Sequence, residues 1–250
     1  ITSRFTPGDA VRIDAITDDG QYHAWTEINV PQRPFEIENV DTVTVPLAQS
    51  GYTTEYLRYR ITINDRPNET NYYRIVIDKQ TTLWGYNHEE GGDDYIYWTK
   101  HSYNFIGRED VVLTDGQPTT GDDEDNGLFD TAKNIYGVFD DTRFRNTSYT
   151  MTVYNNTKIE TGSDSGYFSG MDVIIRLMSI TETEYYYLKA LNLVDSDAYD
   201  ETINEPIKYP SNVHGGTGMV GISTEVTQTI HIISSSHSKG NLAPPVHVYQ

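Results

Sequence analysis

The sequence predicts a mainly β protein: an antiparallel β-sandwich or barrel-like domain with one packed helix, preceded by the closing strands of an immunoglobulin-like domain. Three observations lead to this fold class. Many short segments alternate apolar and polar residues with the two-residue period of a strand. Turn signals rich in Asp, Asn and Gly separate these segments. Only residues 182–194 have the spacing of a convincing helix, so alternating β-α units are not expected.

The first two strands are predicted to form a hairpin. Residues 11–15 and 22–25 both alternate apolar with polar side chains, and the Asp-Asp-Gly run at 18–20 between them is a turn signal. An isolated hairpin is only marginally stable in water. We therefore expect these strands to close an immunoglobulin-like sandwich whose earlier strands precede Ile1.

Two prolines give the predicted domain boundary. Pro31 and Pro34 follow the hairpin and end its strand pattern. The predicted organisation is residues 1–34 as the C-terminal strands of an immunoglobulin-like β-sandwich and residues 35–250 as a β-rich domain with one helix.

The second domain contains several further strand patterns. Residues 57–63 alternate cleanly, 73–77 less so, and 149–154 alternate with threonine on the outer side. Residues 173–177 are apolar at nearly every position, which is typical of a central strand covered on both faces. Residues 227–233 add a late strand.

The helix is predicted over residues 182–194. Thr181, followed three residues later by Glu184, has the spacing of a capping box. We expect the helix to close one side or end of the sheet, with its tyrosines on the strand surface. Its apolar face is predicted to contain Tyr187, Leu188, Leu191 and Val194.

Composition excludes several classes of function. The chain has 37 acidic and 18 basic side chains, a net charge of −19, which argues against nucleic acid and anionic lipid as partners. It has no cysteine, so structural disulfides, thiolate catalysis and zinc–sulfur sites are excluded. The sequence also has no apolar run of about 18 residues that could span a bilayer as a helix.

A glycine-rich segment stands out near the C-terminus. Its notable residues are Glu205, Pro206, Asn212, Gly215, Gly216 and Gly218. Clustered glycines mark backbone that takes positive φ or approaches another segment closely, so a tight turn with a bulge is one interpretation. A phosphate-binding loop is the other, and it fits poorly because no Lys-Ser/Thr pair follows the glycines. Whether the segment contacts a partner or only closes a sheet stays open.

The same segment resembles the C-terminal signature of a family of bacterial surface lipoproteins, domain of unknown function 4249. In that family an aromatic-rich helix precedes Glu-Pro, a short strand and Ser-Asn-x-x-Gly-Gly-x-Gly. The matching residues here are 185–188, 205–206 and 211–218. Upstream, the Asp-Arg-Pro run at 65–67 and Asn-Tyr-Tyr-Arg at 71–74 resemble a hairpin of the same family.

The resemblance implies a cellular context and no reaction. It implies export, a lipid on an N-terminal cysteine that is not in this chain, and exposure on the surface of a bacterial outer membrane. It also implies an outer-membrane transporter barrel and companion surface lipoproteins as partners, by analogy with systems in which surface lipoproteins capture oligomers for import.

Aromatic residues are the predicted ligand-binding side chains. Tyr and Trp provide rigid amphipathic contact area for peptides, sugars or proteins, but strands also use them as cross-strand core pairs. Tyr95 and Tyr97 share one strand face while Ile96 and Trp98 share the other, so one face is expected in the core and the other exposed. The candidate binding residues are Trp84, Tyr86, Tyr95, Tyr97, Trp98 and Tyr103.

An acidic loop is the candidate metal site. A full calcium loop starting at Asp122 would need Glu at position 133, where Lys133 stands, so only an irregular Ca²⁺ site is compatible with the sequence. The alternative is a hydrated acidic loop. The candidate ligands are Asp122, Asp123, Glu124 and Asp125; no other cofactor is expected.

Catalytic signatures are lacking. None of the seven histidines forms a helical i, i+4 pair with Glu, and there is no Gly-x-Ser-x-Gly motif. His231 is predicted to face solvent on its strand, and the His-Glu-Glu run at 88–90 is a weak cation candidate.

We therefore expect a non-enzymatic accessory or binding lipoprotein of a nutrient importer, with oligopeptides or glycans as candidate ligands. The alternatives are an adhesive or structural surface protein and a Ca²⁺-dependent hydrolase.

Overall fold

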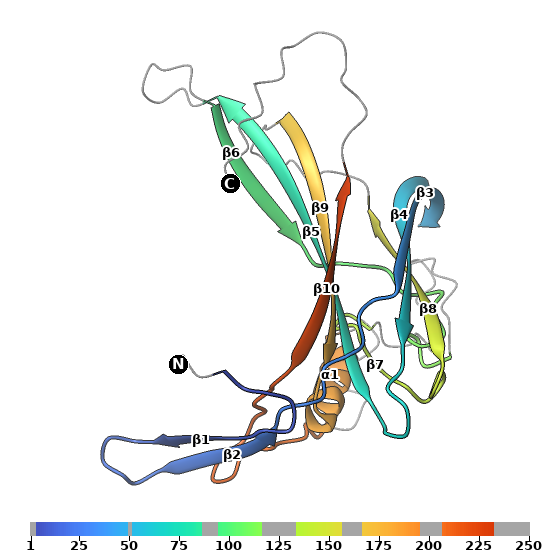
Figure 1. Cartoon of the computed structure of the whole chain (residues 1–250). Helices are drawn as coiled ribbons and strands as arrows, with labels where there is room; N and C mark the ends of the chain where they lie inside the picture. Colours follow the sequence, from blue (N-terminus) through green and yellow to red (C-terminus); the bar gives the residue numbers. More distant parts are fainter. Residues whose placement is uncertain are drawn as a thin grey trace.

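The larger part of the protein is a sandwich of two antiparallel sheets, and a separate hairpin projects from it (Figure 1). The computed structural model describes residues 4–49, 52–86, 95–116, 134–156, 167–195 and 207–232. Strands make up 51% of the structure, and neither sheet closes on itself among the described strands. The predicted mainly β sandwich with one helix is confirmed.

The projecting hairpin consists of β1 (Ala10–Ile16) and β2 (His23–Asn29), as the sequence predicts. The two strands pair antiparallel over their whole length, with Asp14 opposite Trp25. Gly20 has a φ of 70°, a left-handed conformation that the tight turn between the strands requires.

The sandwich body has two sheets. The smaller sheet has the order β3-β4-β8, and the larger has the order β10-β9-β5-β6, with the short β7 also paired to β5. The strands of the smaller sheet are β3 (Asn39–Gln49), β4 (Tyr52–Asn64) and β8 (Ser148–Asn156). Those of the larger are β5 (Tyr72–Tyr86), β6 (Tyr95–Ser102), β7 (Val138–Asp140), β9 (Tyr167–Ser179) and β10 (Thr224–Ile232).

The core lies between the two sheets. Alternate residues of β4, β5, β8 and β9 point inward and are almost completely buried, as the two-residue alternation predicts. These core residues include Tyr59, Ile61, Ile63, Ile75, Ile77, Met151, Val153, Val173, Ile175 and Leu177.

The prediction of a hairpin around residues 65–74 is wrong. β4 and β5 flank this turn, but β4 pairs in the smaller sheet and β5 in the larger, so the turn carries the chain from one sheet to the other. The buried Asp65 carboxylate fixes this corner, because it accepts the backbone N–H of Asn146 at 2.8 Å and a hydrogen bond from the Tyr73 hydroxyl at 3.3 Å. The local pattern identified both strands but not their partners.

β9 is central, as predicted, because it lies between β10 and β5. Its two faces are not equally covered. Val173 and Ile175 are fully buried in the core, whereas Ile174 and Arg176 on the other face are only half-buried. The expectation of full cover on both faces is therefore wrong.

The helix α1 (Glu182–Val194) begins and ends as predicted and packs on one end of the larger sheet. Tyr185 and Leu188 are buried, whereas Tyr187, Leu191 and Val194 of the predicted face are only half-buried. The buried face of the helix is rotated relative to the predicted one, because the Tyr185 ring packs on the Tyr72 ring with centroids 4.9 Å apart.

Within the described residues, no helix combines the length and apolar character needed to cross a membrane.

The capping box of α1 is only half formed. The Thr181 hydroxyl accepts the Glu184 N–H at 3.2 Å, as expected. The Glu184 carboxylate does not return the bond; it is buried beside Gly221, and its Oε2 has no hydrogen-bond partner among the described residues. Burial therefore raises the pKa of Glu184.

Candidate functional site

The outer face of the larger sheet, beyond the end covered by α1, carries exposed polar and aromatic side chains. In an antiparallel sheet, directly opposed residues share a face. His231 on β10 opposes Asp172 on β9, Asp172 opposes Gln80 on β5, and Gln80 opposes His101 on β6. These four residues form one polar row across the sheet.

Hydrogen bonds fix the histidines of the polar row. His231 Nδ1 lies 2.7 Å from an Asp172 oxygen, and His101 Nδ1 lies 3.0 Å from the carboxylate of Asp78. Gln80 donates to the same Asp78 carboxylate at 2.7 Å. Each contact joins an imidazole nitrogen to a carboxylate oxygen, so the neighbouring Asp side chain fixes the orientation of each ring. His231 is exposed, as predicted, with 72% of its side chain accessible.

Aromatic side chains lie on this face next to the polar row. Trp84 on β5 opposes Tyr97 on β6, and Tyr97 is 52% exposed while Trp84 is half-buried. Tyr103 is 57% exposed, and its ring stacks on His101 with centroids 6.1 Å apart. We call this surface, made of the polar row with Trp84, Tyr97 and Tyr103, the aromatic–histidine face; the Asp78 carboxylate that orients His101 is buried beneath it.

The other predicted aromatic residues do not all belong to it. Trp98 opposes the fully buried Leu83, so it lies on the inner face, as the alternation with Tyr97 requires. A Cβ on Gly85 would lie 3.1 Å from the Trp98 ring, which is a tight contact. Tyr86 and Tyr95 are register partners, but their side chains lie outside the described residues.

The glycine-rich segment attaches the hairpin to the body. His214 forms an antiparallel bridge with Trp25, with N–H to carbonyl distances of 3.0 and 2.8 Å. The two rings stack with centroids 4.1 Å apart, and Arg12 covers the Trp25 ring at 4.4 Å. The Thr26 hydroxyl also donates to the Asn212 carbonyl at 2.7 Å. The segment is therefore held beside β2 by a single β-bridge, a ring stack and a side-chain hydrogen bond.

Its unusual residues have structural roles. Gly215 has a φ of 74°, and a Cβ there would lie 2.2 Å from the carbonyl oxygen of His23. The Asn212 side chain accepts the Val220 N–H at 3.0 Å and donates to the Val220 carbonyl at 2.8 Å. Close approach is found at Gly215, whereas Gly218 has a φ of 123° with no atom near the position of a Cβ; Glu205 and Pro206 lie outside the described residues.

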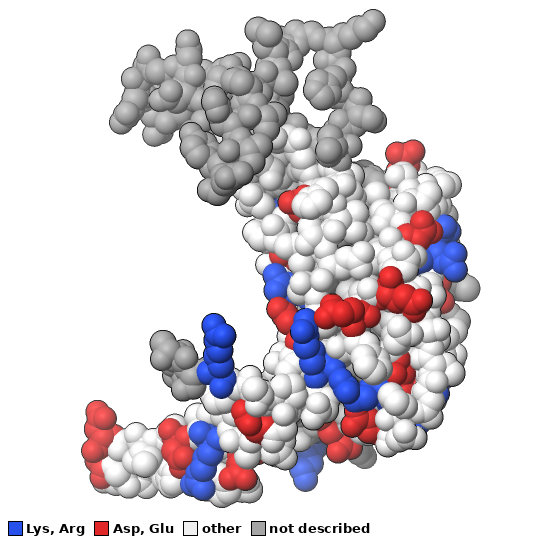
Figure 2. Space-filling model, viewed as in Figure 1, with Lys and Arg blue, Asp and Glu red and all other residues white. Residues whose placement is uncertain are grey.

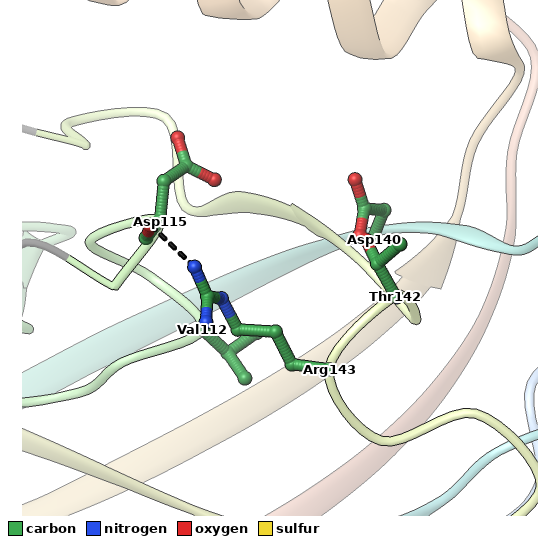
Figure 3. Close-up of a pocket in the computed structure, with 5 residues that line it drawn as sticks. All are labelled: Val112, Asp115, Asp140, Thr142 and Arg143. Carbon is green, nitrogen blue, oxygen red and sulfur yellow. Dashed lines mark hydrogen bonds between the residues drawn. The ribbon is translucent and has the colours of Figure 1, made fainter.

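A cavity of about 380 Å³ lies near β7, lined by Val112, Asp115, Asp140, Thr142 and Arg143 (Figure 3). Its charged groups already bind other protein groups. Arg143 donates to the Asp115 carbonyl at 2.6 Å, Lys189 contacts the Asp115 carboxylate at 2.6 Å, and Asp140 accepts the Tyr185 hydroxyl at 3.1 Å. Burial, together with Asp140, raises the pKa of Tyr185. Sequence reasoning missed this cavity because its residues come from two turns and the end of β7 and share no local motif.

The candidate metal ligands Asp122, Asp123, Glu124 and Asp125 lie outside the described residues, as does the run at 88–90. Within the part of the chain that the structure describes, no group of three or more His, Asp or Glu residues is placed to hold a metal ion.

Comparison with known proteins identifies a family. The family model described as domain of unknown function (DUF4249) matches residues 2–229. No curated protein and no solved structure matches the chain. Because the match covers most of the sequence, and the Asn212 to Gly218 motif is built into the hairpin attachment, the chain belongs to the DUF4249 family.

Proposed function

We propose that this protein is a non-enzymatic binding subunit on the bacterial surface, which captures an oligomeric ligand for an outer-membrane nutrient importer. The observation that carries the proposal is the aromatic–histidine face. It combines exposed aromatic rings with hydrogen-bonding groups whose orientation is fixed by neighbouring side chains.

The dimensions of this face suit an extended ligand. Neighbouring strands are about 4.8 Å apart, so the polar row from His231 to His101 covers roughly 14 Å. That length corresponds to about four residues of extended peptide. Trp84 and Tyr97 supply apolar rings beside the row, and carboxylate, amide and imidazole groups supply acceptors and donors. Oligopeptides and glycans both meet these requirements.

Three of the buried carboxylates, those of Asp65, Asp110 and Asp141, accept backbone N–H groups and so have structural roles. Asp65 accepts the backbone N–H of Asn146, Asp110 accepts those of Val112 and Thr152, and Asp141 accepts that of Asn71. Carboxylates used in this way hold loops in place.

A binding experiment tests the ligand site. We expect oligosaccharide or oligopeptide panels, measured by calorimetry, to contain a ligand whose affinity falls about tenfold or more in Tyr97→Ala or Trp84→Ala. The matched control is Tyr22→Ala, because Tyr22 is also exposed but lies at the hairpin turn, far along the chain from the face. A ligand affected equally by all three substitutions, or panels without any ligand, would contradict the proposal.

The transporter association rests on the family resemblance and needs its own test. Affinity purification from solubilised outer membranes is expected to recover a transporter barrel together with this protein. Recovery of the protein free of any barrel, under conditions that keep other importer complexes intact, would remove this part of the proposal.

An adhesive or structural role is the second candidate, and one observation favours it. The projecting hairpin exposes large apolar side chains, with Ile13 at 47%, Ile16 at 62% and Tyr22 at 72%. Unchanged ligand binding after substitution of the face, together with loss of surface attachment after substitution of Ile16 and Tyr22, would favour this role.

A further inference from the structure

The outer edge of β10 presents backbone groups that no neighbouring strand occupies among the described residues. β10 pairs with β9 along all of Thr224–Ile232 and ends the larger sheet. In Figure 1 it borders the space between the body and the hairpin, and Figure 2 shows a hollow in the molecular surface on that side.

Hydrogen bonds within the sheet identify which groups point outward. The Ile180 N–H donates to Tyr72 of β5, so alternate residues of β9 from Ile180 direct their backbone to β5 and the others direct it to β10. The latter oppose Thr224, Val226, Gln228, Ile230 and Ile232. It follows that Glu225, Thr227, Thr229 and His231 direct their N–H and C=O groups outward.

An independent contact agrees with this assignment. The Glu225 carbonyl accepts a hydrogen bond from the Arg33 side chain at 3.2 Å, on the side away from β9. The Thr224 hydroxyl donates to the Gln32 carbonyl at 3.1 Å. The linker after the hairpin thus covers the beginning of β10, and no other described residue pairs with the edge from Thr227 to His231.

Unlike β10, both edge strands of the smaller sheet are protected against pairing with a further strand. On β8, the N–H of Tyr154 donates to Ile106 at 2.9 Å, and that of Thr152 donates to the Asp110 carboxylate at 2.8 Å. β3 contains Pro46, which has no N–H to offer. Proteins protect edge strands by such covers, by proline or by lysine. The sequence of β10, Thr-Glu-Val-Thr-Gln-Thr-Ile-His-Ile, has neither proline nor lysine.

We propose that β10 is a docking edge for an extended strand of a partner polypeptide, with Lys or Arg alternating with apolar residues. The incoming backbone pairs with Thr227, Thr229 and His231. Its apolar side chains extend the core past Ile230 and Ile232, which pack against the core but are only half-buried. The net charge of −19 favours a basic partner and disfavours a second copy of this chain. The proposed edge shares His231 with the aromatic–histidine face, but it uses the backbone groups of His231, whereas the face uses the imidazole.

The probe is a synthetic peptide of the length of β10, nine residues, with Val and Ile alternating with Lys. Its controls are the peptide with Glu in place of Lys and the peptide with alternate backbone amides methylated. We expect the lysine peptide to bind, each control to bind at least about tenfold more weakly, and the amides of Thr227, Thr229 and His231 to become protected from hydrogen exchange.

Thr229→Pro removes one outward N–H and no ladder bond, so an edge strand tolerates it. We expect Thr229→Pro to lower the affinity for the lysine peptide about tenfold. Thr229→Val keeps the N–H and should bind the peptide as tightly as the unsubstituted protein. If Thr229→Pro does not fold, the methylated peptide and the exchange measurement still decide the outcome.

Three results would overturn the proposal. The first is equal binding of the lysine peptide and its backbone-methylated control, with no loss of affinity in Thr229→Pro. The second is binding lost in Tyr97→Ala with no protection of β10, which would assign the peptide to the aromatic–histidine face and support the proposed function. The third is a dimer, seen by sedimentation and abolished by Thr229→Pro, which would make a second copy the occupant.

Discussion

The hairpin and the sandwich body are both antiparallel β-structure with alternating sequences, yet they are stabilised in different ways. In the body, alternate residues such as Ile61 and Ile175 have no exposed surface. In the hairpin, Ile13 and Ile16 remain 47% and 62% exposed, and burial is restricted to the β2 side, where Thr26 and Ile28 lie. Alternation alone therefore does not create a core; a second layer must cover one face.

The hairpin depends instead on its attachment. The His214 bridge, the Trp25–His214 ring stack and the Thr26–Asn212 hydrogen bond all connect β2 to the glycine-rich segment. These are polar and backbone contacts over a small area, so we expect the hairpin to detach before the body unfolds. The following predictions test this difference, from the largest expected effect to the smallest.

The largest effect is expected in the core. Ile175→Ala should lower the free energy of unfolding by about 2–5 kcal/mol, because it leaves a cavity between the two sheets. The same truncation on the hairpin, Ile13→Ala, should change it by less than about 0.5 kcal/mol. Urea denaturation measures both. Equal losses would show that the hairpin has a core of its own.

Gly215→Val is expected to release the hairpin without unfolding the body. The substitution combines a positive φ with a Cβ 2.2 Å from the His23 carbonyl oxygen, so the segment must move away from β2. We expect a loss of about 1–3 kcal/mol in attachment, seen as faster hydrogen exchange of the Trp25 amide and faster proteolysis of the hairpin.

A second glycine provides the control for that change. Gly170 lies on β9, without positive φ and with no atom near the position of a Cβ. Gly170→Ala should leave the exchange of Trp25 unchanged. Persistent protection of Trp25 in Gly215→Val would mean that the glycine-rich segment does not hold the hairpin.

The smallest effect is expected from pH. Hydrogen bonds from Arg12 and His23 lower the pKa of Asp14 to about 2, from about 3.9 in the unfolded chain. Because the folded-state pKa is the lower one, the Asp14 contribution is present above pH 4 and is lost as the pH falls toward 2. An NMR titration of the Asp14 carboxylate should give this midpoint, and Arg12→Gln should raise it. A midpoint near 4 in the original protein would show that the contacts do not persist in solution.

The sequence was sufficient for elements that depend on local pattern. The first hairpin, the strand cores of β4, β8 and β10, and the limits of α1 follow from periodicity, turn residues and a cap. Parts of the candidate site were also accessible, because strict alternation places Tyr97 and Trp98 on opposite faces of one strand. A single strand contains that information.

Tertiary structure alone decided which segments meet. Periodicity shows that a strand has one buried face, but not which strand lies beside it, so β4 and β5 could not be assigned to different sheets. The row from His231 to His101 and the bridge from His214 to Trp25 join residues more than a hundred positions apart. Such contacts depend on how whole sheets pack, and the packing is set by the shape of the entire core rather than by any short segment.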